Sequence, residues 1–232
     1  MQLKGWIRTS LIDYPDHIAT VFFTGGCNFR CPMCHNADLV LRPAELPNLP
    51  EKEVWDFLER RTEVLDGVVI TGGEPTLQPD LAPFLRRVRA LGYDVKLDSN
   101  GYRPDVLATL LDEGLVDFIA LDVKAPPEKY AHLTGMPELD VSRIECSLTL
   151  LRESGRSYEL RTTVVPGLLD EDDITAIACW IAGTKQYVLQ QFRGVSTLEP
   201  TLEKLAPYPV VKLQAMAKRT KPWVENTTIR GI

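Results

Sequence analysis

Short apolar runs alternate along the chain with segments in which apolar residues recur every three or four positions. The runs are rich in β-branched and aromatic residues, which is typical of buried strands. Six such runs are Ile18–Phe23, Val68–Thr71, Tyr93–Leu97, Phe118–Val123, Tyr158–Val165 and Tyr187–Phe192. The segments between them have helical spacing, as at Leu81, Leu85 and Val88. The pattern therefore predicts strands and helices in regular alternation.

Glycines stand where the predicted helices should end, and a glycine readily takes the left-handed conformation of a helix C-cap. These glycines are Gly92, Gly114, Gly155 and Gly183. The acidic run Asp170–Asp173 favours the start of a helix, because carboxylates interact well with the N-terminal end of the helix dipole.

Strands joined by helices of this length pair in parallel through right-handed crossovers. The sequence thus predicts an α/β fold, an open partial (β/α)6 barrel of parallel strands that is TIM-barrel-like, over residues 1–205. Residues 206–232 are predicted to form a short C-terminal extension packed on the same domain, with a helix near Val211–Ala217.

Charge and cysteine content narrow the function classes. A net charge of -6 is opposite in sign to what nucleic-acid binding needs, so no nucleic-acid partner is expected. No apolar stretch approaches the length of a membrane helix, and Met1–Ser10 lacks the apolar core of a signal peptide, so we expect a cytoplasmic protein with no membrane partner. Three of the five cysteines lie within eight residues, which favours a metal site over a disulfide framework.

Polar and glycine-rich sequences follow the predicted strands, at the end where parallel strand-helix folds bind ligands. Gly25–Asn36 follows the first strand, and Thr71–Pro75 follows the second. Asp98–Gly101 follows the third strand and Asp122–Lys124 the fourth. The fifth and sixth strands end in Val165–Gly167 and Gln190–Arg193. We therefore expect these segments to meet at one rim.

Cys27, Cys31 and Cys34 are spaced so that one loop can wrap three thiolates around an iron–sulfur cube. Three ligands leave one iron open for a substrate. A structural zinc site with His35 as the fourth ligand is an alternative. Cys146 and Cys179 fall within predicted helices and are interpreted as buried packing residues.

The Cys-x3-Cys-x2-Cys loop, followed by Gly-Gly-Glu-Pro after the next strand, resembles the radical S-adenosylmethionine (SAM) superfamily. His35-Asn36, Asp98–Gly101, Leu121–Lys124 and the segment from Arg161 to Gly167 resemble glycyl-radical-enzyme activating enzymes, such as the pyruvate formate-lyase activase. Ser10–Pro15 and the cysteine loop are most similar to anaerobic ribonucleoside-triphosphate reductase activating proteins.

The resemblance implies one [4Fe-4S] cluster on Cys27, Cys31 and Cys34, with SAM on its open iron. It also implies a monovalent cation at Asp98, Ser99, the Ala120 carbonyl and Asp122. The SAM-binding residues that it implies are Met33, His35, Gly72, Gly73, Glu74, Asp98, Asn100, Asp122, Val123 and Lys124.

Two departures from the activase pattern concern the adenine contacts and a second cluster. Gln190–Arg193 stands where the pyruvate formate-lyase activase has a histidine near adenine, so the adenine contacts stay unassigned. Asn36–Thr71 contains no cysteine, so no second cluster is expected.

The resulting hypothesis is an oxidoreductase that accepts an electron from flavodoxin or ferredoxin. It would cleave SAM and make a glycyl radical on a partner, with anaerobic ribonucleoside-triphosphate reductase as the implied partner. The alternatives are a radical SAM enzyme that acts on a small molecule or RNA, and a metal-binding module without catalysis.

Overall fold

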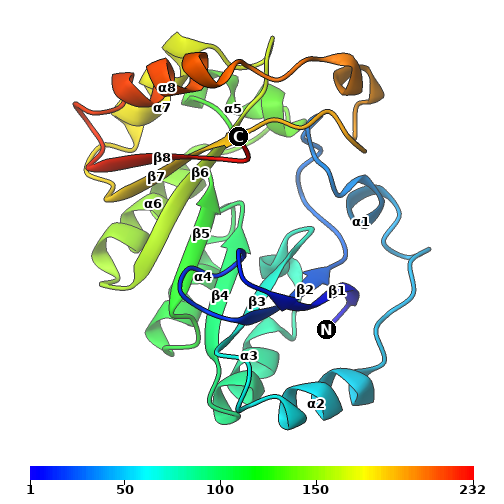
Figure 1. The fold of residues 1–232 in the computed structure, drawn as a ribbon. Helices are drawn as coiled ribbons and strands as arrows, with labels where there is room; N and C mark the ends of the chain where they lie inside the picture. Colours follow the sequence, from blue (N-terminus) through cyan, green and yellow to red (C-terminus); the bar gives the residue numbers. More distant parts are fainter.

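One curved sheet of eight strands, adjacent in chain order, organises the computed structural model, which describes residues 1–232 (Figure 1). β1 is antiparallel to β2, and every later pair is parallel. β1 and β8 are the two edges and do not pair with each other, so the barrel is open. The strands are β1 (Leu3–Ser10), β2 (Ala19–Thr24), β3 (Gly67–Gly72), β4 (Asp94–Ser99), β5 (Phe118–Asp122), β6 (Ser157–Val164), β7 (Gln186–Gln191) and β8 (Asn226–Arg230).

Helices connect successive strands of the sheet (Figure 1). The α-helices are α1 (Ala37–Leu41), α2 (Glu51–Arg60), α3 (Leu81–Ala90), α4 (Pro104–Asp112), α5 (Pro127–Thr134), α6 (Ser142–Glu153), α7 (Glu171–Trp180) and α8 (Val210–Arg219). Two short 3-10 helices, η1 (Pro75–Leu77) and η2 (Pro200–Lys204), complete the set. No helix is long and apolar enough to span a bilayer.

The α/β fold and the six parallel strands predicted from the sequence are confirmed as β2 to β7. The sheet also contains two edge strands that the apolar pattern does not reveal. β1 adds an antiparallel strand before the first predicted unit, and β8 pairs with β7 beyond the last. Both are polar or half-exposed along much of their length, so neither produces the continuous apolar run of a buried parallel strand.

The predicted ends of the helices are also confirmed. All four glycines expected at helix C-termini have positive φ angles, between 64° and 91°. Asp170 caps α7 by accepting hydrogen bonds from the backbone N–H groups of Asp172 and Asp173. The predicted helix in the C-terminal extension is α8.

The interpretation of Cys146 and Cys179 as buried packing residues is wrong. Both thiols are exposed on α6 and α7. The apolar stripes of these helices are formed by other residues, such as Leu148 and Ile177, and the two cysteines lie on the solvent side.

The two faces of the sheet differ in chemistry. A large apolar core fills the space between the sheet and its helices. A second, small core is separate from the first and consists of Tyr14, Ala19, Val21 and Val69. Its strand residues alternate along β2 and β3 with those that face the helices, so they lie on the opposite face of the sheet. Lys96 and Glu159 are also buried, and they occupy alternate strand positions in β4 and β6. The concave face of the barrel is therefore partly charged.

Candidate active site

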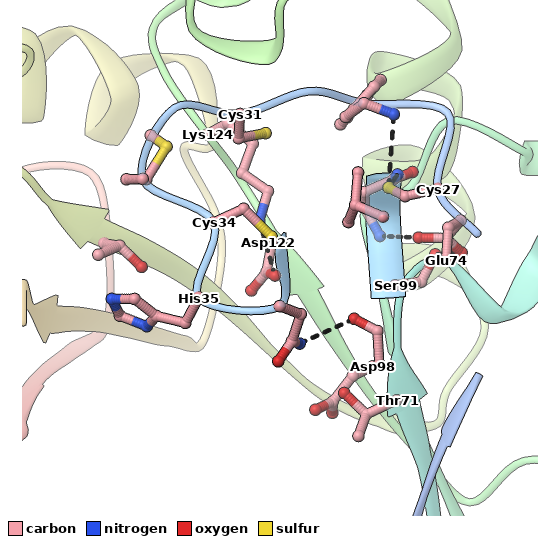
Figure 2. A pocket seen from close by; sticks show the side chains of 18 of the residues that line it. Cys27, Cys31, Cys34, His35, Thr71, Glu74, Asp98, Ser99, Asp122 and Lys124 are labelled. Atoms are coloured by element: carbon pink, nitrogen blue, oxygen red, sulfur yellow. Dashed lines mark hydrogen bonds and ion pairs between the residues drawn. The ribbon is translucent and has the colours of Figure 1, made fainter. Parts of the chain in front are cut away.

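A cavity opens at the carboxyl ends of the strands, where the loops after β2, β3, β4 and β5 meet (Figure 2). The loops and strand ends contribute thiols, carboxylates, amides and two cationic side chains to its wall. The lining residues are Cys27, Phe29, Cys31, Met33, Cys34, His35, Asn36, Val40, Thr71, Gly72, Gly73, Glu74, Asp98, Ser99, Asn100, Asp122, Lys124, Arg161 and Thr163. The prediction that the rim motifs converge is therefore confirmed for the first four loops, whereas Val165–Gly167 and Gln190–Arg193, after β6 and β7, do not line the cavity.

Backbone hydrogen bonds from distant segments hold the cysteine loop. The N–H of Arg30 donates to the carbonyl of Thr134 at the end of α5, at 2.7 Å. The N–H of Leu198, beyond β7, donates to the carbonyl of Cys34 at 2.9 Å. Because these bonds involve main-chain atoms, they fix the path of the loop whatever side chains it carries.

The three thiols of the loop are free and lie in the wall of the cavity. Burial raises the pKa of Cys27 to about 11 and that of Cys31 to about 12, and the positive charge of Lys124 opposes both shifts. No three His, Cys, Asp or Glu side chains are gathered as the ligands of one metal ion would be. A four-iron cluster takes each thiolate on a separate iron, so its ligands need not meet at a single point.

One buried polar group beside these thiols has no partner within the protein. The side-chain oxygen of Asn28 accepts a hydrogen bond from the Asn100 amide at 2.8 Å, while the Asn28 side-chain nitrogen is buried without an acceptor. Buried N–H groups are rarely left unpaired, so this nitrogen is an unsatisfied donor next to Cys27 of the cavity wall.

Close packing against the cysteine loop requires glycine at the end of β3. A Cβ atom on Gly73 would lie 1.9 Å from the carbonyl oxygen of Gly26, and one on Gly72 would lie 2.4 Å from the backbone nitrogen of Thr24. Gly72 also has a φ angle of 111°. The glycine pair is therefore needed for contact between two parts of the chain itself.

Glu74 is 1 % exposed, and its carboxylate accepts four hydrogen bonds from within the protein. The donors are the N–H and hydroxyl of Thr76, the hydroxyl of Ser99 and the N–H of Asn100. Burial raises the pKa of Glu74, and the hydrogen bonds oppose the shift. The side chain thus fixes the end of β4 to the end of β3.

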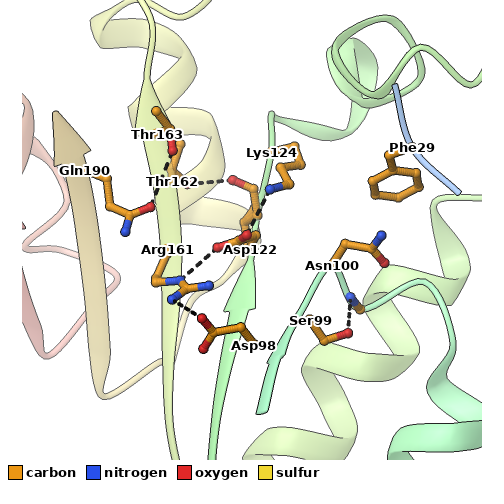
Figure 3. A network of polar contacts seen from close by, with 12 residues as sticks. Phe29, Asp98, Ser99, Asn100, Asp122, Lys124, Arg161, Thr162, Thr163 and Gln190 are labelled. Carbon is orange, nitrogen blue, oxygen red and sulfur yellow. Dashed lines mark hydrogen bonds and ion pairs between the residues drawn. The ribbon is translucent and has the colours of Figure 1, made fainter. Parts of the chain in front are cut away.

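Arg161 of β6 joins the carboxylates at the ends of β4 and β5 (Figure 3). Its guanidinium lies 2.8 Å from Asp122 and 3.3 Å from Asp98, and the Lys124 ammonium is 2.9 Å from Asp122. Burial alone would raise the pKa of Asp122, but Arg161 and Lys124 hold it well below its usual range. Both carboxylates are therefore charged in a largely buried setting.

Of the residues assigned to SAM by resemblance, all but Val123 line the cavity. Val123 is fully buried, and its backbone pairs with β6 through Arg161 and Thr162. His35 is exposed, and its ring Nε2 lies 2.7 Å from the carbonyl oxygen of Arg193.

Several lining residues are absent from the set assigned by sequence, among them Arg161 and Thr163. Asn28 is also absent from that set; it does not line the cavity, but it is bonded to Asn100, which does. Arg161 begins the segment to Gly167 that resembles activating enzymes, and this resemblance is a signal by which its place in the site could have been predicted. Asn28 lies between two of the cysteines, which is a second signal that the sequence offers.

Comparison with known proteins gives consistent matches. A model of the radical SAM superfamily matches residues 21–178. A Methanocaldococcus jannaschii protein provisionally named as a glycyl-radical enzyme activating enzyme is 33 % identical over 99 % of this chain and 96 % of its own length. The pyruvate formate-lyase-activating enzyme of Listeria monocytogenes is 30 % identical, covering 69 % of this chain and 68 % of its own.

Solved structures share the fold at low sequence identity. SuiB of Streptococcus suis bound to S-adenosylmethionine superposes with a TM-score of 0.68 and 15 % identity, covering 89 % of this chain. The coproporphyrinogen III oxidase HemN of Escherichia coli gives a TM-score of 0.60 and 15 % identity over 91 % of this chain. The aligned regions make up 48 % of the SuiB chain and 53 % of the HemN chain, about half of each.

Proposed function

Because the chain belongs to the radical SAM superfamily, we propose that it is an activating enzyme that cleaves SAM reductively and generates a glycyl radical on a partner protein. The observation that carries the proposal is the convergence of three free cysteines, the Gly72–Glu74 segment and the Asp122–Lys124 segment on one cavity. The nearly full-length similarity to a provisionally named glycyl-radical enzyme activating enzyme supports the activase class.

Superfamily membership implies a [4Fe-4S] cluster and SAM, and the donors in the cavity fit both groups. Cys27, Cys31 and Cys34 would each hold one iron, which leaves the fourth iron for SAM. Burial raises the pKa of the Cys27 and Cys31 thiols, and metal binding would remove their protons. The unpaired amide nitrogen of Asn28, next to Cys27 in the chain, would be a donor to any sulfur or oxygen atom of a bound group that reaches it.

Bound together, the cluster and SAM would supply a 5'-deoxyadenosyl radical that takes an α-hydrogen from a glycine. The chain would orient SAM through charge and backbone groups. Lys124 would pair with its carboxylate, and the carbonyl of Gly72, which already accepts from the Asn36 amide at 3.0 Å, has a second lone pair for its ammonium. Met33 and His35 would line the same space and help to exclude water.

The partner would be a glycyl radical enzyme, and the similarity of Ser10–Pro15 to reductase activating proteins favours anaerobic ribonucleoside-triphosphate reductase. The gap between the edge strands β1 and β8 would admit a peptide loop to the cavity. Flavodoxin or ferredoxin would deliver the electron. Residues 206–232 would act as an extension of the domain formed by residues 1–205, since β8 pairs with β7.

The first test is anaerobic purification followed by iron and sulfide analysis and by an assay for 5'-deoxyadenosine after dithionite reduction. We expect about four irons per chain and SAM cleavage. Cys31→Ala should lose both, while Cys146→Ala, which changes an exposed thiol outside the cavity, should retain both. Reconstituted protein that binds no iron or never cleaves SAM would contradict the proposal.

The partner is tested separately by electron paramagnetic resonance. Reduced enzyme, SAM and the reductase should give the doublet of a glycyl radical, and a reductase with its radical glycine changed to alanine should give none. SAM cleavage without a radical on the reductase would refute the partner and retain the radical SAM chemistry.

A further inference from the structure

The two carboxylates at the ends of β4 and β5 already have cationic partners on every oxygen. Asp98 pairs with the Lys96 ammonium through one oxygen and lies 3.3 Å from the Arg161 guanidinium through the other. Asp122 likewise uses one oxygen for Arg161, at 2.8 Å, and the other for Lys124, at 2.9 Å (Figure 3).

Lys96 is the most buried cation of this group, with only 3 % of its side chain exposed. It lies two residues before Asp98 on β4, so both side chains point to the same face of the sheet. Asp98 is the one carboxylate within ion-pair distance of its ammonium. A buried ammonium is tolerated when it is paired, so the position of Lys96 depends on Asp98.

The net charge of the group has a direct bearing on a bound metal ion. Three cations face two carboxylates, which gives one net positive charge before any ligand binds. A negatively charged carboxylate of a ligand would balance it. An additional metal cation would instead increase a charge that is already poorly solvated.

The side-chain oxygen ligands that the resemblance assigns to a monovalent cation are therefore engaged elsewhere. Ser99, the third side-chain ligand, donates its hydroxyl to Glu74 at 2.9 Å. We propose that the ammonium of Lys96 takes the place of the monovalent cation beside SAM, so that SAM binding does not require K⁺ or Na⁺. The inference rests on the proposed function, because it concerns the binding of SAM at the same site.

A tethered ammonium and a free ion differ in one measurable respect. The lysine is part of the chain, so its charge is present at any salt composition, whereas a free ion must be supplied by the buffer. Removing the ammonium while leaving its space empty should recreate a vacant cation position next to Asp98 and convert the protein into a K⁺-dependent one.

The experiment measures the Kd of SAM for cluster-loaded protein by calorimetry, in choline chloride and in potassium chloride at equal ionic strength. For the wild type we expect the two values to agree within about twofold. Lys96→Ala should bind SAM about tenfold or more weakly in choline, because Asp98 loses a buried partner, and K⁺ should restore most of the loss. The thermal midpoint of each protein, measured in both salts, gives a readout that does not depend on SAM.

Two further variants separate charge from packing. Lys96→Met fills the same space without a charge, so its weakened SAM binding should not respond to K⁺. Lys52→Ala removes an exposed lysine on α2 and should behave as the wild type in both salts.

Wild-type protein that binds SAM tightly only with K⁺ would overturn the inference and leave the proposed function intact, and this comparison decides the matter even if the Lys96 variants do not fold. Lys96→Ala with wild-type affinity in choline, or without K⁺ rescue, would also overturn it. Absence of SAM binding in both salts would refute the proposed function and the inference together.

Discussion

Gly73→Ala probes the contact between β3 and the cysteine loop. The new methyl group would lie 1.9 Å from the Gly26 carbonyl oxygen, whereas Cβ atoms in proteins do not approach other heavy atoms within 3.0 Å. One backbone must therefore move by about 1 Å. The obstacle is a carbonyl and not the end of a flexible side chain, so a change of rotamer cannot relieve the clash.

The movement breaks a specific hydrogen bond. The Gly26 carbonyl accepts from the N–H of Glu74 at 2.8 Å, and a shift of about 1 Å stretches this bond beyond its useful range. Overpacking costs about 1–3 kcal/mol and a lost hydrogen bond about 0.5–1.5 kcal/mol. We therefore expect Gly73→Ala to lower the free energy of unfolding by about 2–4 kcal/mol. It should also reduce iron retention, because Cys27 directly follows Gly26.

Urea unfolding of the metal-free protein measures the free energy, and iron analysis after anaerobic reconstitution measures the effect on the site. Gly92→Ala is the matched control. Gly92 has a φ angle of 91°, but a methyl group there would meet no atom within 4 Å, so alanine should cost only the backbone strain of about 1–2 kcal/mol. If Gly73→Ala is no less stable than Gly92→Ala and holds a full complement of iron, the packing argument is wrong.

Three other predictions concern ionisable groups of the site. Burial raises the pKa of Cys27 to about 11 and that of Cys31 to about 12, so at pH 8 their thiolate fractions are at least about a hundredfold below that of free cysteine. In metal-free protein, iodoacetamide should therefore modify the exposed Cys146 long before Cys27 or Cys31. Equal modification rates of the three cysteines, measured by mass spectrometry, would contradict the prediction. Burial would raise the pKa of Asp98, but Arg161 and Lys96 lower it below the unfolded value of about 4. The ionised Asp98 carboxylate therefore stabilises the folded protein above about pH 4, and this contribution is lost as the pH falls. The stability deficit of Asp98→Asn, about 3 kcal/mol at pH 7, should narrow in urea titrations toward pH 3, and a constant deficit would refute the assignment. Glu74→Gln should lower the free energy of unfolding by about 2 kcal/mol, since the amide cannot accept all four hydrogen bonds. An unchanged urea midpoint would show that Glu74 does not hold the ends of β3 and β4 together.

The parts of the molecule that can be predicted from the sequence are those with local signals. β3 and β5 are apolar enough to be recognised alone, and the spacing of Cys27, Cys31 and Cys34 is visible within one loop. The positions of such elements at one rim follow from the general geometry of parallel strand-helix folds.

The parts that cannot be predicted depend on partners far away in the chain. β8 contains Asn226-Thr227-Thr228, a polar sequence that becomes a strand because β7 offers it a free edge. The role of Lys96 likewise depends on Arg161 and Asp122 of other strands, although the alternation of apolar and charged residues in β4 is a detectable signal. A parallel strand buried on both faces is usually apolar throughout, so such alternation indicates a charged inner face.

The segment after β7 is hydrogen-bonded to the cysteine loop without contributing to any motif. The carbonyl oxygen of Arg193 lies within hydrogen-bond distance of the His35 ring, and the N–H groups of Leu198 and Glu199 donate to the carbonyls of Cys34 and Pro32. All these contacts come from beyond residue 178, where the match to the superfamily model ends. The shared core therefore supplies the cysteines and one anchor of their loop, at Thr134, while a part of the chain outside the matched region supplies further anchors. Because main-chain bonds constrain sequence weakly, this segment can change its side chains and still hold the loop, which leaves it free to adapt to a partner protein.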